Sequence, residues 1–225
     1  MLISKSMVDK VITIDKEANI FEAKQKMQEY NIRHIPVVDE NNKLIGIVTD
    51  RDIRSVLPSI LLNNINLEEE KKKISQFRIK DIMTKNPITL LPTHTIQDAL
   101  LLIQKTKVGA FPVVDESGIL TGIISVRDLL SAFISVLGIG EPGTLLGIAV
   151  EDKPGQMKKI VDAITEENIS FGSIMVCKYG KKGERSVFPY LLTQNVATVK
   201  KKLEKMGYKI LDPMEWYIEQ LPQNK

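Results

Sequence analysis

Two short motifs each place a hydroxyl and a carboxylate three residues apart at an expected strand-to-helix turn. The first is Thr49 with Asp52 in G-I-V-T-D-R-D, and the second is Ser125 with Asp128 in G-I-I-S-V-R-D. At this spacing both side chains can converge on one small volume. The carboxylate can accept from both hydroxyls of a ribose, and a hydroxyl beside free helix N–H groups suits a phosphate. A simple helix cap is the alternative interpretation.

The motifs recur because the chain repeats itself at a constant offset of 76 residues. Residues 7–56 align with residues 83–132 without a gap, and 17 of the 50 aligned positions are identical. The identities gather at a proline-containing turn and at the two Gly-to-Asp motifs, where ligand chemistry is commonly placed. The duplication therefore favours a pair of binding sites over two unrelated helix caps.

Each repeat reads as strand, helix, strand, strand and helix. In the first repeat V-I-T-I (11–14) is a β-branched strand, and Asn19 with Glu22 has the spacing of a helix cap. Thr95 and Asp98 hold the corresponding places in the second repeat. The expected apolar helix faces are Ile20, Ala23, Met27 and Tyr30, and Ile96, Ala99, Ile103 and Thr106.

Residues 144–212 are not a third copy of this repeat. Their pattern predicts the order strand, helix, strand, strand, helix, strand, which is the split ferredoxin-like arrangement. The helical connector at 58–78 carries a solvated charge run, and the tail at 213–225 contains W-Y-I-E-Q-L, expected to pack on a surface. The expected strands are 145–151, 170–179, 185–193 and 208–212, and the helices are 156–168 and 196–206.

The composition is that of an ordinary globular protein. The 225 residues are 43% hydrophobic and 26% charged, and a net charge of +3 predicts no particular polyanion partner. Cys177 is the single cysteine, which fits a reducing compartment. The apolar stretch 129–139 is too short to span a membrane, and the N-terminus lacks the pattern of a signal peptide. We expect a cytoplasmic protein.

The paired motifs resemble the CBS domain, a module named after cystathionine β-synthase. The resemblance rests on I-P-V-V-D at 35–39 and F-P-V-V-D at 111–115, each followed by the Gly-to-Asp motif. Two copies in tandem are similar to a CBS pair, or Bateman module, which implies a mixed α/β and α+β fold with a pseudo-twofold axis. The implied boundaries are 1–57 for the first repeat and 79–137 for the second.

The CBS resemblance implies two clefts for adenine nucleotides or related adenosyl ligands. It implies ribose contacts at Asp52 and Asp128, ribose or phosphate contacts at Thr49 and Ser125, and base contacts around each proline. The full set of implied nucleotide-binding residues is Thr13, Arg33, His34, Ile35, Pro36, Thr49, Arg51, Asp52, Thr89, Ala110, Phe111, Pro112, Ser125, Arg127 and Asp128.

The two implied clefts are not expected to be equal, because the repeats differ at positions that could face a ligand. The first cleft should be more polar and the second more apolar, so we expect different affinities. The differing pairs are Arg33 and His34 against Gly109 and Ala110, and Asp50 against Val126.

Residues 144–212 resemble an ACT domain, the amino-acid-binding regulatory module. The matching features are the order of elements and the turn D-K-P-G-Q-M, which starts at Asp152. This resemblance implies a low-molecular-weight effector near Asp152, Gly155 and Met157, while a plain turn remains the alternative. A CBS pair followed by an ACT-like domain is similar to the acetoin-utilisation proteins of the B type.

These resemblances imply a non-catalytic regulator that senses AMP, ADP, ATP or S-adenosylmethionine. The ACT-like domain would dimerise or bind an effector such as an amino acid. Two histidines and one cysteine offer no metal site and no nucleophilic triad, so no cofactor is expected. The alternatives are a nucleic-acid-binding transcriptional regulator and, behind it, a nucleotide-acting enzyme.

A homodimer is the expected assembly, formed through the CBS helices, the ACT-like domain or both. The helix after the second motif carries an apolar face that is unsuited to solvent. We also expect a regulated protein partner, which the sequence does not identify. The residues of the apolar face are Leu129, Leu130, Phe133, Ile134 and Leu137.

Overall fold

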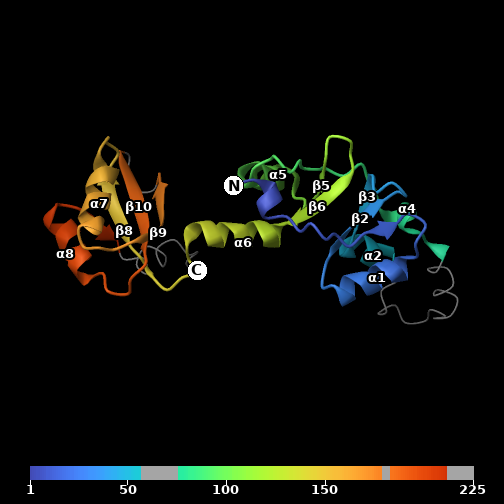
Figure 1. Ribbon diagram of the computed structural model, residues 1–225, viewed down its shortest axis with the longest axis horizontal. Helices are drawn as coiled ribbons and strands as arrows, with labels where there is room; N and C mark the ends of the chain where they lie inside the picture. Colours follow the sequence, from blue (N-terminus) through green and yellow to red (C-terminus); the bar gives the residue numbers. More distant parts are fainter. Residues whose placement is uncertain (57–75, 179–182, 212–225) are drawn as a thin grey trace, which may run out of the picture. The chain divides into compact units, whose positions relative to one another are not determined.

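A computed structural model describes residues 1–56, 76–178 and 183–211 of the chain (Figure 1). The chain divides into two compact units, residues 1–130 and 131–225. Most of the expected connector (58–75), part of the expected turn at 180–183 and the tail from residue 212 onward lie outside the described residues.

The first repeat folds in the expected order of strand, helix, strand, strand and helix. Its short first strand runs parallel to the second, and the third strand is antiparallel to the second. Buried residues of both helices and all three strands form one hydrophobic core. The elements are β1 (Ile14–Asp15), α1 (Ile20–Glu29), β2 (His34–Val38), β3 (Leu44–Thr49) and α2 (Asp50–Val56).

The second repeat is built in the same way, with one shortened element. Its two long strands are antiparallel and pair in the same register as β2 and β3. A single parallel bridge between Leu90 and Val113 stands where the first repeat has β1. The elements are α5 (Ile96–Thr106), β5 (Ala110–Val114), β6 (Leu120–Ser125) and α6 (Val126–Leu137).

The two repeats exchange their leading segments, which are the residues of each repeat ahead of its first strand. Val8, in the leading segment of the first repeat, forms two backbone hydrogen bonds of 2.9 and 3.0 Å with Ile123 of β6. Strand β4 (Thr84–Lys85), in the leading segment of the second repeat, pairs antiparallel with β3, where Thr84 lies opposite Ile47. The two pairs are related by the offset of 76, so each repeat's last strand is extended by the other's leading segment.

The same exchange includes a short helical turn before each repeat. In the turn η1 (Ile3–Lys5) the Ile3 N–H donates to the carbonyl of His94, and in α4 (Ile79–Ile82) the Ile79 N–H donates to the carbonyl of Ala18. Ile3 and Ile79 are both fully buried. The structural repeat therefore begins four residues earlier than the alignment of residues 7–56 indicates.

The buried positions of the two repeats match one another through the offset. Helix faces with apolar residues three and four apart produce this pattern, as the sequence predicts. In the first repeat the buried set is Ile14, Ile20, Ala23, Met27, Ile35, Val37, Val48, Ile53 and Ile79. Met27 is the exception, because its counterpart Ile103 is only half-buried. The buried counterparts of the other eight are Leu90, Ile96, Ala99, Phe111, Val113, Ile124, Leu129 and Ile3.

Three sequence expectations for this unit are wrong in detail. The strand expected at 11–14 is shorter, because only Ile14 and Asp15 pair with β2. Tyr30 does not join the core; it caps the C-terminal end of α1 and is 49% exposed. Leu129 does not belong to an exposed apolar face, because its side chain fills the core position that Ile53 fills in the first repeat.

The sheet of the second unit contains the strand order β11-β8-β10-β9, and the short strand β7 also pairs with β10. Every pair in the sheet is antiparallel. This is the split ferredoxin-like order that the sequence predicts. Gly207 follows the last helix at φ +87°, a conformation that favours glycine and ends the helix. The elements are β7 (Thr144–Leu145), β8 (Gly147–Glu151), α7 (Gln156–Thr165), β9 (Phe171–Cys177), β10 (Glu184–Leu191), α8 (Ala197–Lys205) and β11 (Lys209–Leu211).

Membrane-spanning character is absent from the helices that the structure describes. None of them combines the length and the apolar content needed to cross a bilayer.

The exchange of leading segments predicts that Ile3→Ala destabilises the second repeat despite lying three residues from the N-terminus. Removing a fully buried isoleucine side chain should lower the free energy of unfolding by about 2–4 kcal/mol. Urea denaturation followed by circular dichroism measures the change. Leu2→Ala is the matched control, because Leu2 is 45% exposed. Equal effects of the two substitutions would contradict the exchange.

Candidate functional site

The strand register brings the residues before each proline opposite the hydroxyl of each motif. His34 lies opposite Thr49 in the first repeat, and Ala110 lies opposite Ser125 in the second. The N–H of Asp50 donates to the carbonyl of Arg33 at 3.0 Å. The second repeat has the same bond from Val126 to Gly109, at 3.1 Å. Two local features that the sequence singled out separately therefore meet in one place in each repeat.

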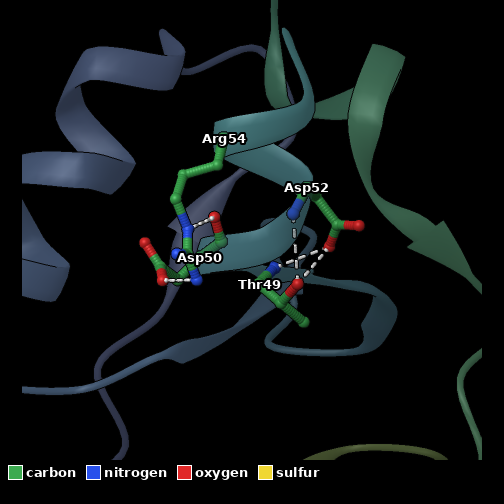
Figure 2. A network of polar contacts seen from close by, with 4 residues as sticks. All are labelled: Thr49, Asp50, Asp52 and Arg54. Atoms are coloured by element: carbon green, nitrogen blue, oxygen red, sulfur yellow. Dashed lines mark hydrogen bonds and ion pairs between the residues drawn. The ribbon is translucent and has the colours of Figure 1, made fainter. Parts of the chain in front are cut away.

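Each hydroxyl and carboxylate pair forms a closed cap at the start of its helix. The Thr49 N–H and hydroxyl both donate to Asp52 Oδ2, at 2.8 and 2.7 Å (Figure 2). The corresponding Ser125 N–H and hydroxyl donate to Asp128 Oδ2, at 2.8 and 2.6 Å. All four bonds use Oδ2, so the second carboxylate oxygen of each aspartate has no bonded partner among the described residues.

The cap alone does not identify a ligand site, because the chain contains a third one. Thr95 and Asp98 make the same bonds at the start of α5, at 2.8 and 2.7 Å. Asp98 is exposed, and backbone and side-chain hydrogen bonds from Thr95 lower its pKa. Helix capping therefore explains the local geometry in all three places, and only the surroundings distinguish them.

Asp128 differs from Asp98 because it lines a pocket of about 300 Å³. Both repeats contribute walls to this pocket, together with the exchanged leading segment of the first repeat. Its volume is at the lower end of the range for small-molecule sites. The lining residues are Val8, Lys10, Val11, Ile12, Asn31, Ile32, Arg33, His34, Gly109, Ala110, Ile123, Ser125, Val126, Arg127 and Asp128.

The pocket brings together six of the residues expected to bind nucleotide. It also contains residues that sequence reasoning missed, of which Lys10 carries a charge. No periodic signal in the sequence points to Lys10, because residues 9 and 10 form a bend and the consecutive residues Lys10, Val11 and Ile12 all line the pocket. The neighbouring strand β6, which is distant in the sequence, could not be predicted from local patterns. The six expected residues are Arg33, His34, Ala110, Ser125, Arg127 and Asp128.

The side chains of the other residues expected to bind nucleotide do not line this pocket, and several of them have structural roles. Ile35 and Phe111 are fully buried in the two cores, which leaves only their backbone for a ligand. Pro36 and Pro112, which follow them in the strands, are buried as well. The carbonyl of Thr13 accepts from Lys26 Nζ at 3.2 Å. The remaining expected residues outside the pocket lining are Thr49, Arg51, Asp52 and Thr89.

The structure assigns some of the polar residues to a different site from the one expected. Arg33 and His34 were assigned to the Thr49 and Asp52 site, but they line the Asp128 pocket on the same wall as Gly109. Asp50 was expected to make the first site more polar. Figure 2 shows its carboxylate turned away from Asp52 toward Arg54, with which it forms a 2.5 Å ion pair.

The His34 imidazole lines the pocket and has a lowered pKa. Burial lowers the pKa of its imidazole below the usual value of 6.5, and the neighbouring Arg33 lowers it further. The carboxylate of Asp52 acts in the opposite direction and raises it. The imidazole is therefore neutral at pH 7, and the electrostatic effect of Asp52 indicates that His34 lies near both aspartate motifs.

The expected effector residues of the second unit lie around the turn between β8 and α7. Asp152 is paired with Arg185, whose Nε donates to Oδ1 at 2.5 Å. Gly155 has φ +87° with open space around it, and Met157 packs against the hydrophobic core. The turn geometry thus accounts for these three residues without a ligand.

Comparison with known families decides what the repeats are. The CBS domain model matches residues 3–59 and 79–135, which are the two repeats with their exchanged segments. The chain belongs to the CBS domain family. Its two CBS repeats form the tandem pair that the sequence resemblance implied. The match ends at residue 135 and so includes only the first five residues of the second unit.

Curated relatives match this chain through the CBS pair. A CBS domain-containing protein from Dictyostelium discoideum is 33% identical over 137 residues, which is 61% of this chain and 94% of that protein. Inosine-5′-monophosphate dehydrogenase from Aquifex aeolicus is also 33% identical, over 124 residues. That match covers 55% of this chain but only 23% of the enzyme.

Solved structures also match the CBS pair. A protein from Vibrio cholerae, described as an acetoin utilization protein (AcuB), is 26% identical with a TM-score of 0.52. It aligns over 63% of this chain and 98% of its own, so its match is of CBS-pair length. The complex of CBSX2 with AMP is 25% identical with a TM-score of 0.50, over 59% of this chain and 96% of that one.

The lowered pKa of His34 predicts a pH-dependent contribution to stability. Below pH 6.5 an unfolded chain protonates this imidazole, while the folded chain resists protonation until the lower folded pKa is reached. The wild type should therefore lose stability relative to His34→Gln as the pH falls through this window. Melting temperatures of both proteins between pH 7.5 and pH 5 measure the difference. A difference in melting temperature that does not change with pH would contradict this interpretation.

Proposed function

We propose that this protein is a non-catalytic regulator whose CBS pair binds an adenosyl ligand in the Asp128 pocket. The observation that carries the proposal is the pocket itself, which places Asp128 and Ser125 beside walls from both repeats. Membership of the CBS family and the AMP complex of CBSX2, a similar structure, support this ligand class.

The chemistry of the pocket suits a ribose and its neighbours. Asp128 is held by Ser125 through Oδ2, which leaves Oδ1 as an acceptor for ribose hydroxyls. Ile12, Ile32 and Ala110 supply apolar surface suited to the face of a purine. The carboxylate is already oriented by its cap, so little entropy is lost when it binds.

A ligand in this pocket would couple the two repeats to each other. Its walls come from residues 8–12 and 31–34 of the first repeat and its leading segment, and from 109–110 and 123–128 of the second. A ligand that contacts all four segments favours the packing in which they are correctly spaced. The regulatory output is this shift in packing, transmitted to a partner protein that remains to be identified.

A second, weaker site is expected at Thr49 and Asp52, which the offset relates to Ser125 and Asp128. Its cap is the same, but Asn86 takes the place of Lys10 and Gly109 takes the place of Arg33. The two sites should therefore bind the same ligand with different affinities. Thr13 and Thr89 would serve as further polar contacts at their edges.

A catalytic role has less support than a regulatory one. The matched dehydrogenase contains the CBS region as only 23% of its length, so the shared segment does not carry the enzyme's own activity to this chain. Among the described residues, no group of three or more His, Cys, Asp or Glu side chains is placed to hold a metal ion. A nucleic-acid-binding role is disfavoured by the near balance of charge.

The second unit is proposed to be an ACT-like domain that dimerises or binds a small effector. Its antiparallel order β11-β8-β10-β9 and the glycine at φ +87° before α7 support this assignment. Asp152, Gly155 and Met157 mark the turn where an effector such as an amino acid would bind. An acetoin-related role rests on the Vibrio cholerae neighbour alone, which matches the CBS pair.

The proposed assembly is a homodimer that uses the apolar face of α6. Leu130 is 57% exposed, Phe133 45% and Ile134 42%, although all three are large and apolar. Their spacing of three and four residues places them on one helix face. A second copy of the same face would cover this surface.

Nucleotide binding is tested by isothermal titration of AMP, ADP, ATP and S-adenosylmethionine into the wild type, Asp128→Asn and Asp52→Asn. We expect Asp128→Asn to lower the affinity about tenfold or more, because the amide loses an acceptor for the ribose. Asp52→Asn should have a smaller effect. Asp98→Asn is the matched control, since it breaks the same cap away from the pocket.

Two results would overturn this proposal. One is that none of the four compounds binds to the wild type. The other is that Asp98→Asn weakens binding as much as Asp128→Asn, which would mean that the aspartates act through helix stability alone. If Asp128→Asn and Asp52→Asn lose the same affinity, only the predicted difference between the two sites is contradicted.

The dimer is tested by light scattering of Leu130→Glu at micromolar concentration. A carboxylate in the centre of an apolar contact is costly to desolvate, so the variant should be monomeric while the wild type is dimeric. Ser135→Glu is the control, because Ser135 is an exposed polar residue of the same helix. A monomeric wild type would exclude the dimer.

A further inference from the structure

Three cationic side chains line the Asp128 pocket, and only one anionic side chain does. The cations are Lys10, Arg33 and Arg127, and the anion is Asp128. Elsewhere in the described chain cations commonly pair with carboxylates, as Lys80 does with Glu17 and Lys202 with Glu166. None of the three pocket cations has an ion-pair partner among the described residues. Their charges are therefore available to a ligand.

The cations reach the pocket from three separate segments of the chain. Lys10 follows the exchanged segment that Val8 anchors on β6, Arg33 precedes β2, and Arg127 lies in the first turn of α6. Bringing like charges together costs free energy that an anion would relieve. Neutral His34 adds nothing to this charge at pH 7, and Asp128 offsets only one of the three.

From this arrangement we infer that the Asp128 pocket selects phosphorylated adenosine ligands over S-adenosylmethionine and adenosine, and that Lys10 is the residue that makes the selection. The inference rests on the proposed function and narrows its ligand class. A phosphate group would occupy the cationic side of the pocket while Asp128 holds the ribose. A sulfonium cation in the same place would be repelled by three positive charges.

Two members of the cationic set are not preserved by the repeat, Lys10 and Arg33, which corresponds to Gly109. Lys10 is the selective residue because it is the one of these two that the exchanged segment brings to the pocket. Arg127 corresponds to Arg51, so both motifs supply an arginine after their hydroxyl. Lys10 corresponds to Asn86, which carries no charge. The exchanged segment therefore gives the Asp128 pocket a cation that the matched position in the other site lacks.

The test compares titrations of AMP, adenosine and S-adenosylmethionine into the full-length wild type and Lys10→Met. In the wild type AMP should bind at least about tenfold more tightly than the other two compounds. Lys10→Met should weaken AMP about tenfold, the effect of one charge-assisted hydrogen bond, and change adenosine less than about twofold. The preference for AMP should also fall as salt is raised, because Lys10, Arg33 and Arg127 are all exposed to solvent ions.

The control is Lys24→Met, which removes the same charge from the exposed face of α1 and should leave all affinities unchanged. The inference fails if S-adenosylmethionine or adenosine binds the wild type as tightly as AMP. It also fails if Lys10→Met leaves AMP unchanged or weakens AMP and adenosine equally. If none of the three compounds binds, the proposed function itself fails, and the two failures are thus distinguishable.

Discussion

The backbone hydrogen bonds between each repeat's last strand and the other repeat's leading segment are the constraint on which the first unit depends. Val8 on β6 and β4 on β3 hold the two repeats in one arrangement. The same bonds carry Ile3 and Ile79 into the opposite cores and carry Lys10 to the pocket wall. Core packing and site composition are therefore consequences of one pairing pattern.

In this protein the local geometry of a helix cap does not by itself identify a ligand-binding site. Three hydroxyl and carboxylate pairs form the same helix cap, at Thr49, Thr95 and Ser125. The tertiary surroundings of Ser125 and Asp128 add a pocket whose cations have no ion-pair partner in the described part of the chain. The cap still matters to binding, because it fixes the orientation of Asp128 before any ligand arrives and so reduces the entropy lost on binding.

Much of the fold could be predicted from the sequence because its determinants are local. The offset of 76, the helix faces at Ile20 and Ile96 and the ferredoxin-like order of the second unit all depend on short-range patterns. Lys10 was missed because its neighbour β6 lies more than a hundred residues away in the chain. The ion pair of Asp50 with Arg54 was not anticipated either, although its spacing of four residues is a local helix pattern.

The exchanged leading segments also bear on how such a chain could have arisen. A protein with a single repeat could not fill its own core position at Ile79, since that residue comes from the segment before the other repeat. Such a protein would have to exchange leading segments with a second copy of itself to complete its core. In this chain both repeats and both leading segments belong to one molecule, so the exchange is a folding step within it. The two halves differ at positions such as Lys10 and Asn86.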